Sequence, residues 1–486
     1  MTAATIPLSP GPNPGPGLGE PASDDHAITL SWDEFTREIR AAEATGLCAH
    51  PVRLKGRIDA IDLATGELRT MYDTATERDG ALLTSCGNRR ESVCPACSAG
   101  YKRDARQLVR AGLTGGKGIP DTVAAHPCVF ATFTAPSFGP VHARRMCGKT
   151  VLPCRPRRDR NERRCPHSRD ISCPKRHADD DPRLGRPLCG DCYDYEAAVA
   201  FNAGAGELWR RFTTYLPRHL AALAGLTQKQ LRSLVAVRYV KVAEYQARGV
   251  IHFHAIIRLD APGDTCQPPP ARFSADLLAD AIRQAAAAVA VVPDDGPAVV
   301  LRFGDQIDPR PIRHSDSLPG TGHKLSVEAV GNYIAKYATK ALDAPGVPDR
   351  PLRSRHDLAA LRCSRHQAQM IRTAWELGGG TPGPASRLCK WAHMLGYGGH
   401  FLTKSRRYSV TFGQLRRART DHRKAQRHPE GPRDPWGRPL DETVVLVLAT
   451  WTYVGPAHTI APAAELALAA ADRARAHEAP ATDHAA

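Results

Sequence analysis

The sequence lacks any apolar run of the roughly 20 residues that a membrane-spanning helix needs. Its Pro/Gly-rich start, residues 1–25, lacks the basic region and apolar core of a secretory signal. No repeat recurs at the periods of solenoids or propellers. These absences argue against an integral membrane protein, an exported protein and a repeat array. They predict a cytoplasmic protein without a membrane partner.

Acidic residues are few relative to basic ones. Lys and Arg number 66 against 50 Asp and Glu, which gives a formal net charge of +16 and a pI of about 9.4. A surplus of this size on a soluble chain favours a polyanionic partner, nucleic acid before an anionic membrane. Part of the surplus follows from a composition rich in Ala, Arg, Pro and Gly, so charge alone does not fix the partner.

Hydrophobic periodicity and turn residues predict a mixed order of helices and strands. The polar, Cys-rich segment 147–192 cannot bury an apolar core, so it is expected to need metal or nucleic acid to become ordered. Helices are expected over residues 31–46, 101–111, 196–224, 271–291 and 326–342, and strands over 52–63, 129–134, 299–303 and 444–454, the last of a buried type.

The segment VAEYQARGVIHFHAIIRL, residues 242–259, places two histidines two positions apart in a β-prone run. Chance alone predicts about one such pair in a chain with 20 histidines, so the spacing decides little. If residues 247–249 form a three-residue hairpin loop with Gly249 in the left-handed conformation, Glu244 pairs with His252. Period 2 then puts Glu244, His252 and His254 on one face.

Two imidazoles and a carboxylate suit an open site for Mg²⁺ or Mn²⁺ that leaves positions for phosphate oxygens. We therefore predict His252, His254 and Glu244 as metal ligands. Gln246 lies on the same face and competes as the third ligand, and a different loop length would exchange Glu244 for Tyr245. The alternative is a pair of hydrogen-bonded histidines in an ordinary strand.

The segment NYIAKYATK carries Tyr333 and Tyr337 at i and i+4, with Lys336 and Lys340 at the same spacing. The ordinary interpretation is an amphipathic helix with aromatic core contacts and solvated lysines. The functional interpretation is a tyrosinate that attacks a phosphodiester with help from a metal and a nearby ammonium group. A second tyrosine could serve a second transfer.

Fourteen cysteines in a chain without export signals favour metal ligands or redox dithiols over structural disulfides. Near the N-terminus, a four-thiolate structural zinc site is favoured over a thioredoxin-like pair, because no βαβ pattern surrounds the Cys-x-x-Cys. The second cluster offers more candidates than one zinc ion needs, among them His167 and Cys154. The predicted zinc ligands are Cys48, Cys86, Cys94 and Cys97 for the first site, and Cys189 and Cys192 with two of Cys165, Cys173 and His177 for the second.

Three elements in order resemble the motifs of the HUH rolling-circle replication initiators. They are FATFT (130–134), HFH (252–254) and YIAKY (333–337), the last in a two-tyrosine form. Longer stretches are similar to the replication initiators of actinobacterial plasmids and integrative elements, from about Cys48 to Val454. They include CGNRRESVCPACSAGYKRDA, FATFTAPSFGPVH, LCGDCYDYEAAVAFN, GVIHFHAIIRLD and WAHMLGYGGHFLTKSRRYSVTFGQLRR.

The resemblance implies an α+β protein whose HUH endonuclease domain has a central antiparallel sheet and a tyrosine helix, with small zinc-binding modules. It implies a metal-dependent DNA nickase and ligase that leaves a 3′-hydroxyl primer and a covalent 5′-phosphotyrosine. Tyr337 would be the nucleophile and Tyr333 the auxiliary group, with Lys336 or Lys340 orienting the phosphate. Origin DNA, single-stranded or hairpin, and the host helicase and polymerase are the implied partners.

Under this interpretation the chain divides into five segments. They are a disordered tail (1–28), a helical and zinc-knuckle module (29–118), an HUH catalytic domain (119–345) with a Cys-rich insertion at about 145–195, a basic DNA-binding region (346–458) and an Ala-rich tail (459–486).

The basic runs 155–169 and 404–427 would ordinarily be solvated faces. Beside a strand-transfer site they favour binding of backbone phosphates. The predicted contacts are Lys404, Arg406, Arg407, Arg416 and Arg417. Two alternatives remain: a relaxase or single-strand transposase of the same chemistry, and a non-enzymatic zinc-dependent DNA-binding regulator. Relaxases usually carry their tyrosine before the histidine motif, whereas here it follows.

Overall fold

The computed structural model describes two compact units, one of residues 1–101 with 416–486 and one of residues 102–415. The residues that it describes are 40, 43–77, 80–157, 163–263, 266–293, 299–312, 347–348, 350–380, 387–427, 429, 431, 433–441, 443–456 and 469. The predicted helix 326–342, with both tyrosines and both lysines, lies outside the described residues, as does most of the helix predicted over 31–46.

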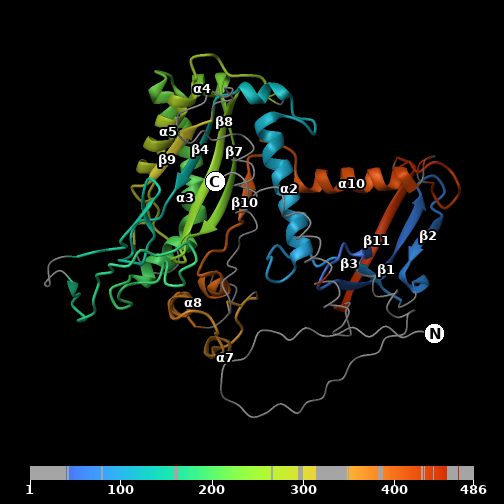
Figure 1. Ribbon diagram of the computed structural model, residues 1–486. Coiled ribbons are helices and arrows are strands. Elements are labelled where there is room, and N and C mark those ends of the chain that lie inside the picture. Colours follow the sequence, from blue (N-terminus) through green and yellow to red (C-terminus); the bar gives the residue numbers. More distant parts are fainter. Residues whose placement is uncertain are drawn as a thin grey trace, which may run out of the picture. The chain divides into compact units, whose positions relative to one another are not determined.

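The larger unit is built on a five-stranded antiparallel sheet of order β10-β7-β8-β4-β9 (Figure 1). The predicted strand 129–134 is present as β4, and β9 was not predicted. The strands are β4 (Cys128–Phe133), β7 (Ala236–Tyr245), β8 (Ile251–Asp260), β9 (Ile307–Pro311) and β10 (Leu402–Lys404). The predicted strand 299–303 is reduced to a single bridge between Val291 and Leu301.

One face of this sheet is apolar because alternate residues of its strands are apolar. Phe133 of β4 and Phe253 of β8 pack against Trp209 and Phe212 of helix α3 (Tyr195–Leu223). Helix α5 (Ala275–Ala288) belongs to the same core. The side chain of Asp194 accepts a hydrogen bond from the backbone of Ala197 and so caps α3. These helices leave the opposite face of β8, which carries the histidines, free of this core.

Shorter elements complete the larger unit. Helix α8 contacts α3, and the small strands β5 and β6 pair with each other in the Cys-rich insertion. The bounds are η2 (Asp121–Ala125), β5 (Arg145–Cys147), β6 (Thr150–Leu152), α4 (Gln228–Leu234), α7 (Arg355–Ala359), α8 (Arg365–Leu377), α9 (Arg387–Lys390) and η4 (Ala392–Met394). Two further helices, α2 (Pro95–Thr114) and α10 (Phe412–Arg427), each contain residues of both units.

The smaller unit is a sheet of order β11-β1-β2, with β3 also pairing with β1. Its strands are β1 (Val52–Asp62), β2 (Leu68–Asp73), β3 (Leu82–Thr84) and β11 (Val445–Pro456), and η1 (Thr74–Thr76) follows β2. The strand predicted over 444–454 is present, but the prediction that it is buried was wrong. Leu448 is 44% and Tyr453 63% exposed, because none of the described helices packs extensively over β11.

No described helix is both long and apolar enough to span a bilayer. The mixed α+β composition with antiparallel sheets agrees with the expected fold class. The five-segment division stays a prediction.

Candidate metal centres

The predicted register of the histidine hairpin is confirmed. Glu244 of β7 faces His252 of β8, and Val242 faces His254. The backbone of Gln246 donates to Val250, and Gly249 has a φ of +74°, the left-handed conformation that the turn requires. The hairpin therefore puts both imidazoles and the carboxylate on the face of the sheet opposite α3.

The three polar side chains converge to hydrogen-bonding distances. His252 Nε2 lies 2.8 Å from Glu244 Oε2, and His254 Nε2 lies 3.1 Å from His252 Nε2. His254 Nε2 is also 3.3 Å from the same carboxylate oxygen. All three donor atoms lie within 4.8 Å of one another, which is the arrangement of ligands around a metal ion.

Neighbouring strands hold the histidines in place. Thr132 Oγ1 of β4 lies 3.1 Å from His254 Nδ1, so the other ring nitrogen faces Glu244. Phe130 stacks on the same imidazole, with ring centroids 5.7 Å apart. A partner on the distal nitrogen of a ligating histidine fixes the ring and raises its basicity. These contacts come from FATFT, the first of the three motifs.

The protonation states also suit a cation. Burial raises the pKa of Glu244, but its hydrogen bonds to His252 and His254 outweigh burial, and the net pKa is lowered. Burial lowers the pKa of His254, which favours the neutral imidazole that can donate a lone pair. The His252 side chain is 14% exposed and that of His254 4%, so the site opens on the side of His252.

In the smaller unit, Cys48, Cys86, Cys94 and Cys97 form a second centre, here called the Cys48 tetrad. The sulfur of Cys48 lies 3.8 Å from that of Cys94 and 3.6 Å from that of Cys97, and Cys86 lies 3.8 Å from Cys97. These distances exceed a disulfide bond of about 2.05 Å. Zinc–sulfur bonds of about 2.3 Å in a tetrahedron place the sulfurs roughly 3.8 Å apart, so the cluster fits zinc.

The remaining predicted zinc ligands do not share one site. Cys165, Cys189 and Cys192 join His167 in the His167 tetrad. Cys173 and His177 join His142 and Cys154 in a separate group, the His142 tetrad. His167 and Cys154 stood among the sequence candidates, but His142 did not, because it lies 31 residues before Cys173 and belongs to no Cys-x-x-Cys signature. Three tetrads, where two sites were expected, can hold zinc.

Comparisons with known proteins agree with the motifs. The family model RepSA, "Replication initiator protein, pSAM2", matches residues 34–472. The chain belongs to the RepSA family of replication initiators. A "Replication initiator protein" of Streptomyces ambofaciens is 44% identical over 436 residues, 88% of each chain. No solved structure matches this chain.

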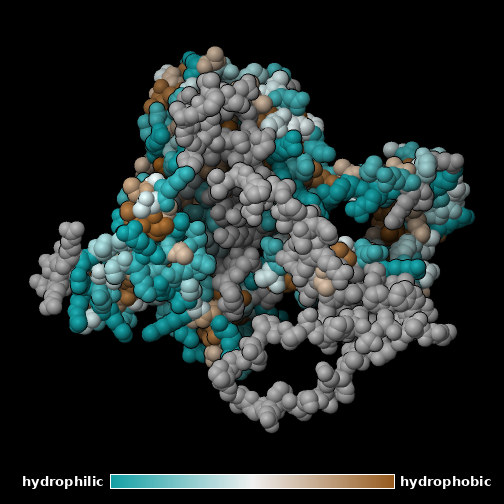
Figure 2. All heavy atoms as spheres, in the orientation of Figure 1, coloured by the Kyte–Doolittle hydropathy of each residue, from teal (hydrophilic) through white to brown (hydrophobic). Residues whose placement is uncertain are grey.

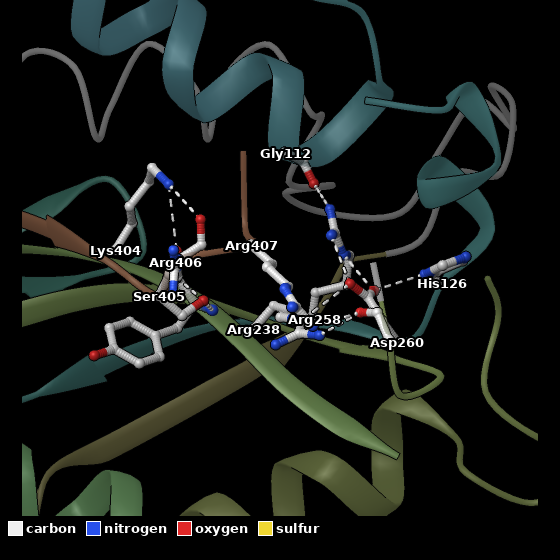
Figure 3. Close-up of polar contacts among 11 residues, drawn as sticks. Gly112, His126, Arg238, Arg258, Asp260, Lys404, Ser405, Arg406 and Arg407 are labelled. Atoms are coloured by element: carbon white, nitrogen blue, oxygen red, sulfur yellow. Dashed lines mark hydrogen bonds and ion pairs between the residues drawn. The ribbon is translucent and has the colours of Figure 1, made fainter. Parts of the chain in front are cut away.

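The basic residues predicted to bind DNA fall into both units of this RepSA-family chain. Arg416 and Arg417 are exposed on α10, over which Figure 2 shows a mainly hydrophilic surface. Lys404 lies at the end of β10, and its ammonium donates to the carbonyls of Ser405 and Arg406 (Figure 3). Arg407 donates to the carbonyl of Gly263. Lys404 and Arg407 are thus partly engaged with the protein backbone, and their contact with DNA stays a prediction.

A buried network of ionic contacts lies at the C-terminal end of β8 (Figure 3). Arg258 donates through Nε and Nη2 to both oxygens of Asp260 at 2.7 and 2.8 Å, and through Nη1 to the carbonyl of Gly112 in α2. His126 Nδ1 lies 2.8 Å from the same carboxylate. The side chains of Arg258, Asp260 and His126 are at most 1% exposed. The network ties α2 to the histidine strand.

Replacing Asp260 with Asn is expected to destabilise the larger unit by about 3–5 kcal/mol, because it leaves the Arg258 guanidinium buried without its counter-charge. Burial raises the pKa of Asp260, but hydrogen bonds from His126 and Arg258 outweigh it and lower the pKa. The carboxylate therefore stabilises the fold above its ordinary pKa, and this contribution is lost as pH falls through the lower folded pKa.

Urea denaturation at neutral and acidic pH measures both effects. The matched control is Asp308→Asn, which removes an exposed ion pair with Arg310 and should cost less than about 1 kcal/mol. Equal losses in the two variants would contradict the role assigned to the buried network.

Proposed function

We propose that this protein initiates rolling-circle replication by nicking and rejoining one strand of origin DNA through a tyrosine. The convergence of Glu244, His252 and His254 on adjacent strands carries the proposal. Membership of the RepSA family supports the biological role, and the ordered triple of motifs supports the HUH fold and chemistry.

The phenolate of Tyr337 attacks the scissile phosphorus, a P–O(Tyr) bond forms, and the bond from phosphorus to the 3′ oxygen breaks. The Tyr337 hydroxyl gives its proton to solvent, and the departing 3′ oxygen takes one proton from solvent and becomes the 3′-hydroxyl primer, while the 5′ phosphate stays bonded to the tyrosine. Lys336 or Lys340 orients the phosphate, and Tyr333 serves a later transfer. These four residues lie outside the described residues, so their roles rest on the resemblance.

The triad of Glu244, His252 and His254 would hold Mg²⁺ or Mn²⁺, which when bound withdraws charge from the phosphoryl oxygens. Glu244 supplies the negative charge that favours a divalent cation, and Thr132 orients His254. The three Cys/His tetrads would hold structural Zn²⁺. Lys404, Arg406, Arg407, Arg416 and Arg417 would bind the DNA backbone.

The test is incubation of the full chain with Mn²⁺ and single-stranded oligonucleotides that carry the origin. Wild type and Tyr333→Phe are expected to form a covalent 5′ adduct, visible as a shifted band on a denaturing gel, whereas Tyr337→Phe is not. The reverse pattern would exchange the roles of the two tyrosines. Intact DNA with folded, metal-loaded wild type would overturn the nicking proposal, and tight duplex binding without adduct would favour the regulator.

A further inference from the structure

The Cys-rich insertion has almost no apolar core of its own. Among the described residues of 145–195, the buried ones are Cys154, Cys165, Cys173, His177, Gly185, Cys189 and Tyr193. Five of these belong to the two tetrads of the insertion. A segment that buries its metal-binding side chains and little else depends on the metal for its folding free energy. Of the other two, Tyr193 belongs to the core of the larger unit, and Gly185 contacts the histidine hairpin.

The His142 tetrad has the geometry of a closed zinc site. His142 Nδ1 lies 3.3 Å from His177 Nε2, and Cys173 Sγ lies 3.4 Å from the same nitrogen. Zinc bonds of about 2.0–2.3 Å in a tetrahedron place such donor atoms roughly 3.3–3.6 Å apart. Two ring nitrogens that face each other at this distance are well explained by one cation that accepts both lone pairs.

Contacts behind the ligand atoms of the tetrad are independent support for a zinc site. His177 Nδ1 lies 2.7 Å from Asp181 Oδ2, which places the lone pair of the other ring nitrogen toward the cluster. Arg183 donates to the same carboxylate and holds it in place. The backbone N–H of Ala143 donates to Cys154 Sγ at 3.2 Å. A carboxylate behind a ligating histidine is typical of zinc sites.

A short path of backbone contacts joins this tetrad to the histidine hairpin. His142 accepts from the backbone of Gly185 at 2.8 Å and donates to Arg186 at 2.9 Å. Gly185, at φ +79°, packs directly on the hairpin turn: a Cβ added there would lie 2.1 Å from the carbonyl carbon of Ala247. The turn lies five residues before His252.

The hairpin turn is also held from its other sides. Arg248 donates to the carbonyls of Ala135 and Pro136, just beyond β4. Asn202 of α3, which is fully buried, donates to Gly249 and accepts from Ile251. Gly185 supplies the contact at Ala247, and its position is set through His142. Contacts from α3, from the residues just after β4 and from the insertion thus fix the position of the turn.

We propose that the His142 tetrad is a separate Cys₂His₂ zinc site and that its zinc, acting through Gly185, positions the hairpin carrying His252 and His254. His142 and Gly185 are thereby positioning residues. The effect on nicking rests on the proposed function, but the metal content and the order of the hairpin do not.

Native mass spectrometry of the full chain loaded with Zn²⁺ tests the site. His142→Ala should carry one zinc ion fewer than wild type, in which the tetrads account for three. Asp181→Asn should keep three, with zinc at this site released by chelator at roughly 10- to 100-fold lower concentration. Cys147→Ala, an exposed cysteine of the same insertion outside both tetrads, is the matched control and should resemble wild type. A zinc count in His142→Ala equal to that of wild type would overturn the assignment.

Hydrogen–deuterium exchange of the peptide 246–254 tests the coupling. Exchange should be at least about threefold faster in His142→Ala. Gly185→Ala should show the same acceleration while retaining three zinc ions, because it disturbs only the contact. Unchanged exchange in a His142→Ala protein that has lost one zinc ion would refute the coupling. If the wild-type protein has these properties but forms no DNA adduct, this inference holds and the nicking proposal is refuted.

Discussion

Replacing both His252 and His254 with Ala is expected to reduce formation of the covalent DNA adduct by roughly 10³-fold or more. The two imidazoles supply two of the three converging ligand atoms, and Glu244 alone cannot hold a divalent ion tightly. Metal stabilisation of phosphoryl charge amounts to several kcal/mol, and each 1.4 kcal/mol corresponds to about tenfold in rate. Adduct yield against time, with Mn²⁺ at saturation for wild type, gives the ratio.

Binding of Mn²⁺, measured by calorimetry without DNA, separates the loss of metal from the loss of DNA binding. The double variant should bind no Mn²⁺ at the sheet, whereas Thr132→Val, which removes the partner of His254 Nδ1, should weaken binding about 10- to 100-fold. His219→Ala is the control, because this half-buried histidine of α3 has Gln284 as a polar partner and belongs to none of the metal clusters among the described residues. Adduct formation at the wild-type rate in the double variant would rule out this metal site.

Low pH should act on the same site. Both imidazoles must be neutral to bind a cation, so Mn²⁺ affinity is expected to fall as the histidines become protonated. Because burial lowers the pKa of His254, that ligand stays neutral below the ordinary histidine range.

The triad could be predicted from sequence because all of its geometry is local. A turn glycine sets the register of one hairpin, and period 2 then determines which residues share a face with His252. Glu244 follows from these two rules alone, and the structure has the same register. The contact between Thr132 and His254 could not be predicted from these local rules, since it depends on which strand pairs with the other edge of β8.

The tetrads could be predicted only in part from local sequence patterns. Cys-x-x-Cys pairs are visible in the sequence, and they supply half of the Cys48 tetrad and half of the His167 tetrad. The His142 tetrad contains no such pair. Its members are brought together by chain reversals in a segment without hydrophobic periodicity, so nothing in their spacing separates them from Cys165. The prediction therefore named most members of the tetrads but merged two of the tetrads into one site.

The exposed strand β11 was mispredicted for a related reason. Runs of Val, Leu and aromatic residues usually indicate a strand covered on both faces. Here the strand pairs along its whole length with β1, but none of the described helices packs extensively over it, and Leu446, Leu448 and Tyr453 are exposed. Apolar composition predicted the strand correctly and its environment incorrectly.

Replacing Cys94 with Ser is expected to unfold the smaller unit while the larger one stays folded. Cys94 and Cys48 are fully buried and, among the described residues, form a small cluster with Ala49, Cys86 and Cys97. Structural zinc contributes roughly 10–16 kcal/mol in small zinc domains, more than the total stability of a typical domain. The exposed apolar residues of β11 indicate that the sheet itself contributes little stability.

Native mass spectrometry should show one zinc ion fewer, and hydrogen exchange should become fast in residues 52–62 but not in 251–260. Cys389→Ser provides the control, because it removes a fully buried thiol that belongs to none of the metal clusters among the described residues. This variant should keep all three zinc ions and lose only packing energy. A Cys94→Ser protein with full zinc content and a protected β1 strand would show that the four thiols pack as ordinary cysteines, and that the smaller unit is stabilised by contacts other than zinc.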